Sequence, residues 1–151
     1  PYKLSLSRKP QKVSEHLTFL GEIPQRNDFE IRSQFGVHRV GETFEPDFVM
    51  EDSALVYDAG ESISIITGCS HAGICNIVQY AVSLFEKPVA GIIGGFHLKE
   101  VNDRVEKTIE YLAGLGLKEL YPCHCTSFAV RSAIHQRIPV GEVGVGMKIE
   151  W

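Results

Sequence analysis

Three stretches of this sequence share one arrangement, which limits the possible folds more than any other feature. In each stretch, mostly apolar or β-prone residues end in Gly, Pro or Cys, a histidine follows within a few residues, and a helical pattern begins soon after. The stretches are residues 62–73, 89–98 and 119–126. An apolar run bounded by turn residues predicts a buried strand, and alternation with helical segments predicts parallel strands in one sheet.

The histidines of the three stretches are His71, His97 and His124. Loops at the carboxyl ends of parallel strands lie along one edge of a sheet, and ligands bind at that edge in open α/β folds. Neutral imidazole is the commonest protein ligand of transition metals. We therefore predict a metal site to which His71, His97 and His124 contribute.

The length and composition restrict the class of protein. A chain of 151 residues, 44% hydrophobic and 23% charged, is long enough for one globular domain with a core. Its formal charge of -4 argues against nucleic-acid and membrane-surface partners, because both favour basic patches. No apolar run approaches the roughly 20 residues that span a bilayer, and no signal-peptide pattern is present. We expect a cytoplasmic protein with a small-molecule substrate, and neither nucleic acid nor membrane as partner.

Residues 1–151 are predicted to form a single domain with three parts. Residues 1–16 are polar and basic and predict an irregular arm. Residues 17–53 start with a candidate strand at 17–20 and continue as a loop-rich segment, of the kind that is often functional. Residues 54–151 predict a sheet with helices that carry the three histidine loops. Because the sequence starts at Pro1 without an initiator methionine, we expect a fragment of a longer protein.

Hydrophobic periodicity and capping residues give the expected elements of the last part. A hairpin is predicted where an Asp-Ala-Gly-Glu turn joins the first two strands. Helices are predicted at 74–85, from a cap at Asn102 or Asp103 to Gly114 or Gly116, and from a cap at Thr126 or Ser127 to about Arg137. The predicted strands are 54–57, 63–66, 89–93, 117–121 and an alternating tail at 142–151.

Three motifs carry a resemblance to a known family: Gly-Cys-Ser-His-Ala-Gly at 68–73, Gly-Gly-Phe-His-Leu at 94–98 and Cys-His-Cys-Thr at 123–126. The sequence resembles the carboxyl-terminal half of metallo-β-lactamase fold hydrolases. It looks closest to the branch that includes the archaeal dihydropterin-methyl-aminobenzene phosphate synthases. Short matches at 21–24, 29–30, 46–47 and 52–55 extend the resemblance over nearly the whole chain. The resemblance implies an α/β fold, an αββα sandwich with a binuclear metal site at one edge.

The resemblance also implies roles for the histidines. His71 takes the place of the third histidine on the first metal, and His124 that of the histidine on the second. The family usually places a bridging aspartate in the loop at 94–97, where this sequence has none, so His97 is a candidate replacement.

The signature His-x-His-x-Asp-His, which supplies ligands to both metals, does not occur in this sequence, so the chain carries half of such a site. It is a piece of a longer hydrolase, the partner of a second chain that completes the site, or a degenerate non-catalytic relative. The start at Pro1 favours the first explanation.

A completed site would carry out metal-assisted hydrolysis with one or two zinc ions, with iron or manganese as alternatives. Thr126 and Ser127 lie at a predicted helix start, where free backbone N–H groups favour an anion. This placement suggests a phosphate ester or pyrophosphate as substrate. Asp52, just before the first clear strand, is a further candidate that either lines the site or orders its own loop.

Two other classes of function fit the same residues. In a structural module, sulfur and nitrogen ligands would close a zinc site and hold two loops together, because structural zinc sites fill all four positions with protein groups. The candidate ligands of that closed site are Cys69, His71, Cys123, His124 and Cys125. In a non-catalytic interaction domain, no metal would bind and the histidines would only form hydrogen bonds within their loops.

Overall fold

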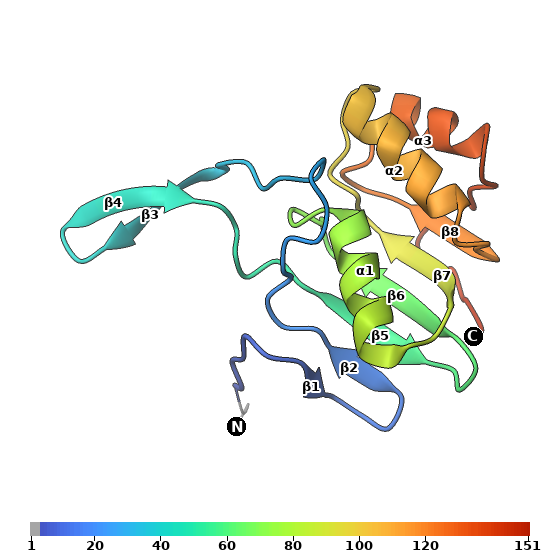
Figure 1. The fold of residues 1–151 in the computed structure, drawn as a ribbon, viewed down its shortest axis with the longest axis horizontal. Helices are drawn as coiled ribbons and strands as arrows, with labels where there is room; N and C mark the ends of the chain where they lie inside the picture. The colour runs from blue at the N-terminus through green and yellow to red at the C-terminus, as the bar shows by residue number, and fades with distance from the viewer. Residues whose placement is uncertain (1–3) are drawn as a thin grey trace.

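The computed structural model describes residues 4–151, so the first three residues of the predicted arm lie outside the described part. A six-stranded sheet with strand order β1-β2-β5-β6-β7-β8 forms the body, and a separate two-stranded hairpin projects from it (Figure 1). The strands of the sheet are β1 (Gln11–Lys12), β2 (Leu17–Phe19), β5 (Ala54–Asp58), β6 (Ile63–Thr67), β7 (Val89–Gly94) and β8 (Glu119–Pro122). The helices are α1 (Ile74–Phe85), α2 (Asp103–Ala113) and α3 (Phe128–His135).

The half of the sheet that carries the histidine loops is parallel, as the sequence predicts. Ile65 of β6 pairs with Ile92 of β7, which pairs with Leu120 of β8, and all three side chains are buried. Strands β1, β2, β5 and β6 pair in antiparallel fashion, so the predicted hairpin of β5 and β6 is confirmed. The carboxyl ends of the three parallel strands reach one edge of the sheet. We call the segments that follow them, 68–73, 95–102 and 123–127, the rim loops.

Each rim loop leads into a helix that buries apolar residues. The buried residues of α2 and α3 recur at three- and four-residue spacing. Helix α1 is buried on all sides in its first turn, at Ile74, Cys75, Asn76, Ile77 and Val78, and then at Ala81. Two predicted caps are present: Asn102 accepts a hydrogen bond from the Val105 N–H, and Ser127 accepts one from the Val130 N–H. No helix within residues 4–151 has the length and apolar character that a membrane span needs.

The segment between β2 and β5 contains regular structure that the sequence did not predict. Strands β3 (Gly36–Val40) and β4 (Thr43–Asp47) form an antiparallel hairpin that extends away from the sheet (Figure 1). Nearly all of its side chains are exposed, so neither face carries the alternation of apolar and polar residues by which a strand is recognised. The prediction of a loop-rich segment is therefore wrong for 36–47.

The predicted final strand at 142–151 does not form. This tail crosses the face of the sheet without joining an edge: Val143, Met147 and Trp151 line a cavity together with Ile66 and Ile93. The indole N–H of Trp151 donates to the carboxylate of Glu119, which fixes the end of the tail against β8. Side-chain docking has replaced the ladder of backbone hydrogen bonds that the alternation suggested.

A buried carboxylate from a distant segment holds the first turn of α1. Helix α1 starts after Gly73 and has no side-chain cap of its own. Glu30, fully buried, accepts hydrogen bonds from the Cys75 N–H at 3.1 Å and the Asn76 N–H at 2.8 Å. A carboxylate is favoured there, because the first helical N–H groups lack partners and the helix dipole is positive at this end. The side-chain amide of Asn76 also donates to the Ala72 carbonyl, which fixes the loop of His71.

The Glu30 contact predicts a specific loss of stability. Glu30→Gln keeps the size of the side chain but turns one acceptor toward a helical N–H into a donor, so one buried N–H loses its partner. We expect the free energy of unfolding to fall by about 1–3 kcal/mol. Urea denaturation followed by circular dichroism measures this, with Glu45→Gln on the exposed β4 strand as the matched control. Equal midpoints for the two variants would contradict the role of Glu30.

Candidate metal centre

The rim loops hold strained backbone at the positions that carry the candidate ligands. Each loop has one non-glycine residue with positive φ: Ser70 at 56°, His97 at 49° and His124 at 20°. Such conformations cost of order 1–3 kcal/mol each and persist only where the surroundings enforce them, often at functional sites. Ser70 immediately precedes His71, so all three candidate histidines are placed by, or next to, strained residues.

Hydrogen bonds between the rim loops hold these residues in their strained conformations. The Gly95 N–H donates to the Gly68 carbonyl at 2.8 Å, and the Ser70 hydroxyl donates to the Gly95 carbonyl at 2.7 Å. The Cys123 N–H donates to the Gly94 carbonyl at 2.9 Å. These bonds continue the parallel pairing past the ends of the strands. The three rim loops therefore behave as one connected unit.

His71 and His97 lie side by side. Their ring centroids are 4.2 Å apart with the planes at 38°, and Phe35 contacts both rings edge-on. Within the described residues, the Nδ1 atom of His97 is buried and has no hydrogen-bond partner. Desolvation and then the neighbouring His71 lower the pKa of His97. A neutral imidazole with a buried free nitrogen is what a transition-metal ligand needs, so this pair fits a metal ion.

His124 lies in a second group of donors. Its Nε2 atom is 3.2 Å from the Cys69 sulfur, and the ligand atoms of Cys69, His124 and Cys125 all lie within 4.8 Å of one another. The Cys123 sulfur is on the other side of the ring, 3.6 Å from Nδ1. Of the five candidate ligands of a closed zinc site, Cys69, His124 and Cys125 lie together, whereas His71 is next to His97 and Cys123 is at the opposite nitrogen of His124.

The other predicted site residues position the rim loops. The Asp52 carboxylate accepts a hydrogen bond at 2.8 Å from the Ala72 N–H, directly after His71. Thr126 is 3% exposed, and its hydroxyl accepts from the Phe96 N–H, next to His97. Ser127 uses its hydroxyl to cap α3, and its N–H donates to the Leu98 carbonyl. In these contacts the hydroxyl oxygens of Thr126 and Ser127 both accept hydrogen bonds from backbone N–H groups.

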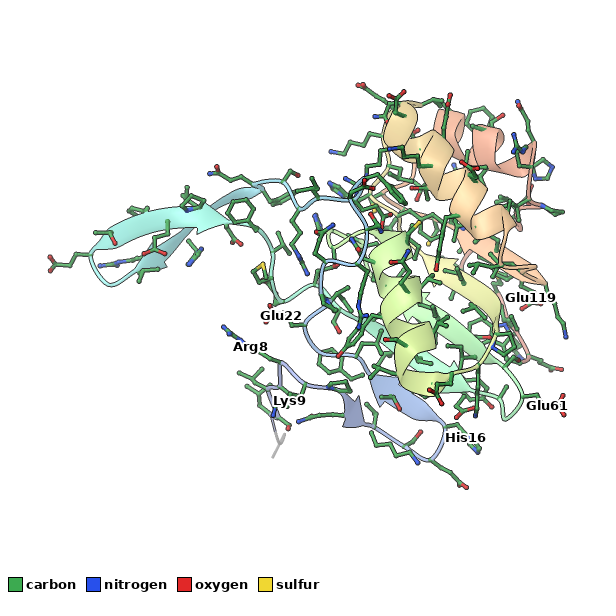
Figure 2. All side chains as sticks on the ribbon, viewed as in Figure 1. Arg8, Lys9, His16, Glu22, Glu61 and Glu119 are labelled. Carbon is green, nitrogen blue, oxygen red and sulfur yellow. The ribbon has the colours of Figure 1, made fainter. Side chains whose placement is uncertain are left out.

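Sequence patterning did not indicate a role for Phe35, because this residue lies in a segment without periodicity. Its ring is 65% exposed although it contacts His71 and His97, so it forms a wall of the centre that is open to solvent. A cavity of about 500 Å³ is lined by Arg8 and Glu22, and none of the candidate ligands lines it. Figure 2 shows these two residues facing each other, and it places His16 at the end of the sheet where the Glu61 turn lies. His16 is thus remote from the rim loops.

Comparison with known proteins yields two curated relatives from Methanocaldococcus jannaschii. An uncharacterized protein is 30% identical over 134 residues, 88% of this chain and 49% of the relative. A 7,8-dihydropterin-6-methyl-4-(beta-D-ribofuranosyl)-aminobenzene-5'-phosphate synthase is 32% identical over 128 residues, 82% of this chain and 44% of the relative. The chain thus spans about half the length of these relatives. No family model matches the chain.

The fold has a close counterpart among solved structures. A metal-dependent hydrolase of the beta-lactamase superfamily superposes with a TM-score of 0.82 at 26% identity, covering 99% of this chain and 58% of the other. The α/β fold and the resemblance to the metallo-β-lactamase superfamily, including the synthase branch, are therefore confirmed. The solved neighbour is metal-dependent by its description, in agreement with a metal centre at the rim loops.

The environment of His97 predicts how stability depends on pH in the metal-free protein. The unfolded chain protonates an imidazole near pH 6.5, whereas the folded protein protonates His97 only at lower pH. Between these values the unfolded chain binds more protons, so the free energy of unfolding falls as the pH drops below about 6.5. His97→Gln should reduce this fall, and His38→Gln on the exposed hairpin should leave it unchanged. Urea denaturation in the presence of a chelator, at about pH 7.5 and about pH 5, measures the free energy of unfolding of both variants. The same fall between the two pH values in both variants would contradict the prediction.

Gly95 predicts a steric requirement at the second donor group. A Cβ atom there would overlap the His124 imidazole and the Cys125 sulfur, whereas a Cβ at Gly68 meets open space. We expect Gly95→Ala to displace His124, to cost about 1–3 kcal/mol of stability and to weaken zinc binding. Gly68→Ala is the matched control in the neighbouring loop. Denaturation and zinc titration test both variants, and indistinguishable behaviour would show that the close approach is not needed.

Proposed function

We propose that this chain, which has the carboxyl-terminal half of a metallo-β-lactamase fold, forms one half of the metal centre of a metal-dependent hydrolase. The observation that carries the proposal is the contact between His71 and His97 at the rim loops, with a buried Nδ1 atom of His97 that lacks a partner. A buried nitrogen without a hydrogen bond is costly, and metal ligation is a common way to satisfy it. The metal-dependent hydrolase of matching fold supports the same conclusion.

The residues of this chain would hold and orient the ion. When bound, the metal acts as a Lewis acid and lowers the pKa of a coordinated water from about 15.7 toward about 7. Desolvation keeps the His97 imidazole neutral, and Thr126 fixes its loop through the Phe96 N–H. Asp52 fixes His71 through the Ala72 N–H. Imidazole nitrogens fit zinc or iron, and manganese is the alternative if the missing ligands are oxygens.

Residues outside this chain would complete the centre. The sequence lacks the His-x-His-x-Asp-His signature, so an amino-terminal half or a second chain must bring the remaining ligands. The span of about half of the relatives supports this arrangement. The exposed wall formed by Phe35 offers a surface that the missing half could cover. A cytoplasmic location is part of the same proposal.

The substrate in this proposal is a small molecule with a phosphate ester or pyrophosphate group. Its support is the name of one relative, which describes synthesis of an aminobenzene 5'-phosphate. The predicted anion site at the start of α3, where the Ser127 hydroxyl accepts from the Val130 N–H, is a second support. Hydrolysis and the phosphorylated substrate thus depend mainly on the comparisons, whereas metal binding depends on the histidine geometry.

Zinc stoichiometry tests the metal centre. Equilibrium dialysis of the chain against zinc, followed by elemental analysis, should show one ion fewer in the His71→Ala, His97→Ala double variant than in the wild type. The control is His38→Ala, His135→Ala, which removes two histidines outside the rim loops and should keep the wild-type count. Equal zinc counts in the wild type and in the His71→Ala, His97→Ala variant would refute the histidine pair. A wild-type chain that binds no zinc would mean that this half alone does not hold the ion, and the same comparison is then made on the longer product.

Where the gene encodes residues before Pro1, the longer product tests the hydrolase. It should hydrolyse bis(p-nitrophenyl) phosphate in the presence of zinc, and the His71→Ala, His97→Ala variant should lose that activity. The His38→Ala, His135→Ala variant should retain it. A longer product that binds zinc but leaves phosphate esters intact would refute the substrate class while preserving the metal centre.

A further inference from the structure

The second donor group has the dimensions of a metal site with two sulfur ligands. Zinc–sulfur bonds are about 2.3 Å and zinc–nitrogen bonds about 2.0–2.1 Å, so two ligands of one tetrahedral ion lie roughly 3.5–3.8 Å apart. The Cys69 sulfur and Nε2 of His124 are already 3.2 Å apart. All three ligand atoms of Cys69, His124 and Cys125 are within 4.8 Å of one another. Side-chain rotations of about 1 Å would bring them to a common ion.

Burial raises the pKa of the Cys125 thiol, and one backbone N–H directed at its sulfur partly offsets this effect. The backbone N–H of His97 donates to the Cys125 sulfur at 3.2 Å, and the Cys125 thiol donates to the Cys69 carbonyl. An N–H directed at sulfur stabilises the deprotonated ligand, as hydrogen bonds to ligating sulfurs do at other metal sites. The same contact ties the sulfur group to the loop of His97.

The geometry around His124 also determines which cysteine sulfurs can share an ion with its Nε2 atom. Cys69 lies at Nε2 of His124, whereas Cys123 lies at Nδ1, and the two nitrogens of one imidazole face in different directions. Cys123 therefore cannot share an ion with the Nε2 ligand. Cys75 is fully buried in the first turn of α1, where its backbone N–H donates to Glu30. Cys69 and Cys125 are the two sulfurs that can act together, and the exposure of His124 leaves an entry path for an ion.

We propose that Cys69, Cys125 and Nε2 of His124 bind one thiophilic divalent ion, zinc above all, and leave one coordination position for a ligand from outside this chain. The inference deepens the proposed function and rests on it for the role of the ion, but not for its binding. Thiolates and imidazole select zinc over magnesium or manganese. Each thiol gives up its proton to solvent when the ion binds, so uptake releases up to two protons per ion.

Cobalt substitution tests the ligand set. Titration of the chain with Co²⁺ under a phosphine reductant should produce intense thiolate-to-cobalt absorption in the near ultraviolet together with visible d–d bands. Cys69→Ser and Cys125→Ser should each lose most of the thiolate absorption. Cys123→Ser is the matched control, since its sulfur contacts the other nitrogen of the same imidazole, and it should keep the full signal. The reductant excludes a disulfide between Cys69 and Cys125.

Thiol protection supplies a measurement that needs no variant. In the wild-type chain, saturating zinc should slow the alkylation of Cys69 and Cys125 by iodoacetamide at least about tenfold, read by peptide mass mapping, while Cys123 remains reactive. Equal reactivity of the three with and without zinc would overturn the inference even if a variant failed to fold.

The outcomes separate this inference from the proposed function. Cobalt d–d bands without thiolate absorption would mean that histidines alone bind the ion, so the sulfur site fails and the metal centre stands. Thiolate absorption in a chain whose zinc count is unchanged by His71→Ala, His97→Ala would confirm the sulfur site and refute the histidine pair. Loss of the thiolate signal in Cys123→Ser but not in Cys69→Ser would assign the ion to the Nδ1 side of His124, where Cys123 lies, and would overturn the inference.

Discussion

The parallel pairing of β6, β7 and β8 is the constraint on which the centre depends. Parallel strands end at one edge, so residues far apart in sequence become neighbours without a local signal that joins them. The pairing does not stop at the strand ends, because the Gly95 N–H and the Cys123 N–H continue it into the rim loops. Cys69 and His124, which are 55 positions apart, are within contact distance for this reason.

The strain in the rim loops is balanced by contacts among the loops themselves and by one contact from the segment before β5. Positive φ at Ser70 and His97 would relax in an isolated loop. Here the Ser70 hydroxyl is bound to Gly95, Thr126 holds the residue before His97, and Asp52 holds the residue after His71. The segment before β5 thus helps to hold the loop of His71 in place, although its sequence lacks periodicity.

The sequence predicted the elements with strong patterns and failed where the pattern was weak or misleading. Helix α1 and the caps Asn102 and Ser127 follow from periodicity and local hydrogen bonding, which are short-range properties. The β3–β4 hairpin could not be recognised, since strands exposed on both faces carry no alternation. The tail alternates like a strand but docks through Trp151, and the choice between pairing and docking depends on the whole sheet.

The same limit applies to the centre. The three strand-loop-histidine stretches predict that His71, His97 and His124 reach one edge, and the structure places all three on the rim loops. Which donors contact each other is decided by loop backbone and by ring orientation, which leave no mark in the sequence. Periodicity therefore could not separate the His71–His97 pair from the sulfur group, nor assign Phe35 to the wall of the site.

The charge of the proposed centre gives a reason for its unusual ligands. If His97 takes the place that the resemblance gives to a bridging aspartate in the loop at 94–97, the proposed centre has one negative charge fewer next to its ions. Neutral imidazoles cannot replace that charge, and uncompensated cations in a partly buried site are costly. Cys69 and Cys125, as thiolates, would contribute two negative charges beside His124. The replacement of the aspartate and the presence of the paired sulfurs are then two parts of one compensation, with a preference for zinc as its chemical consequence.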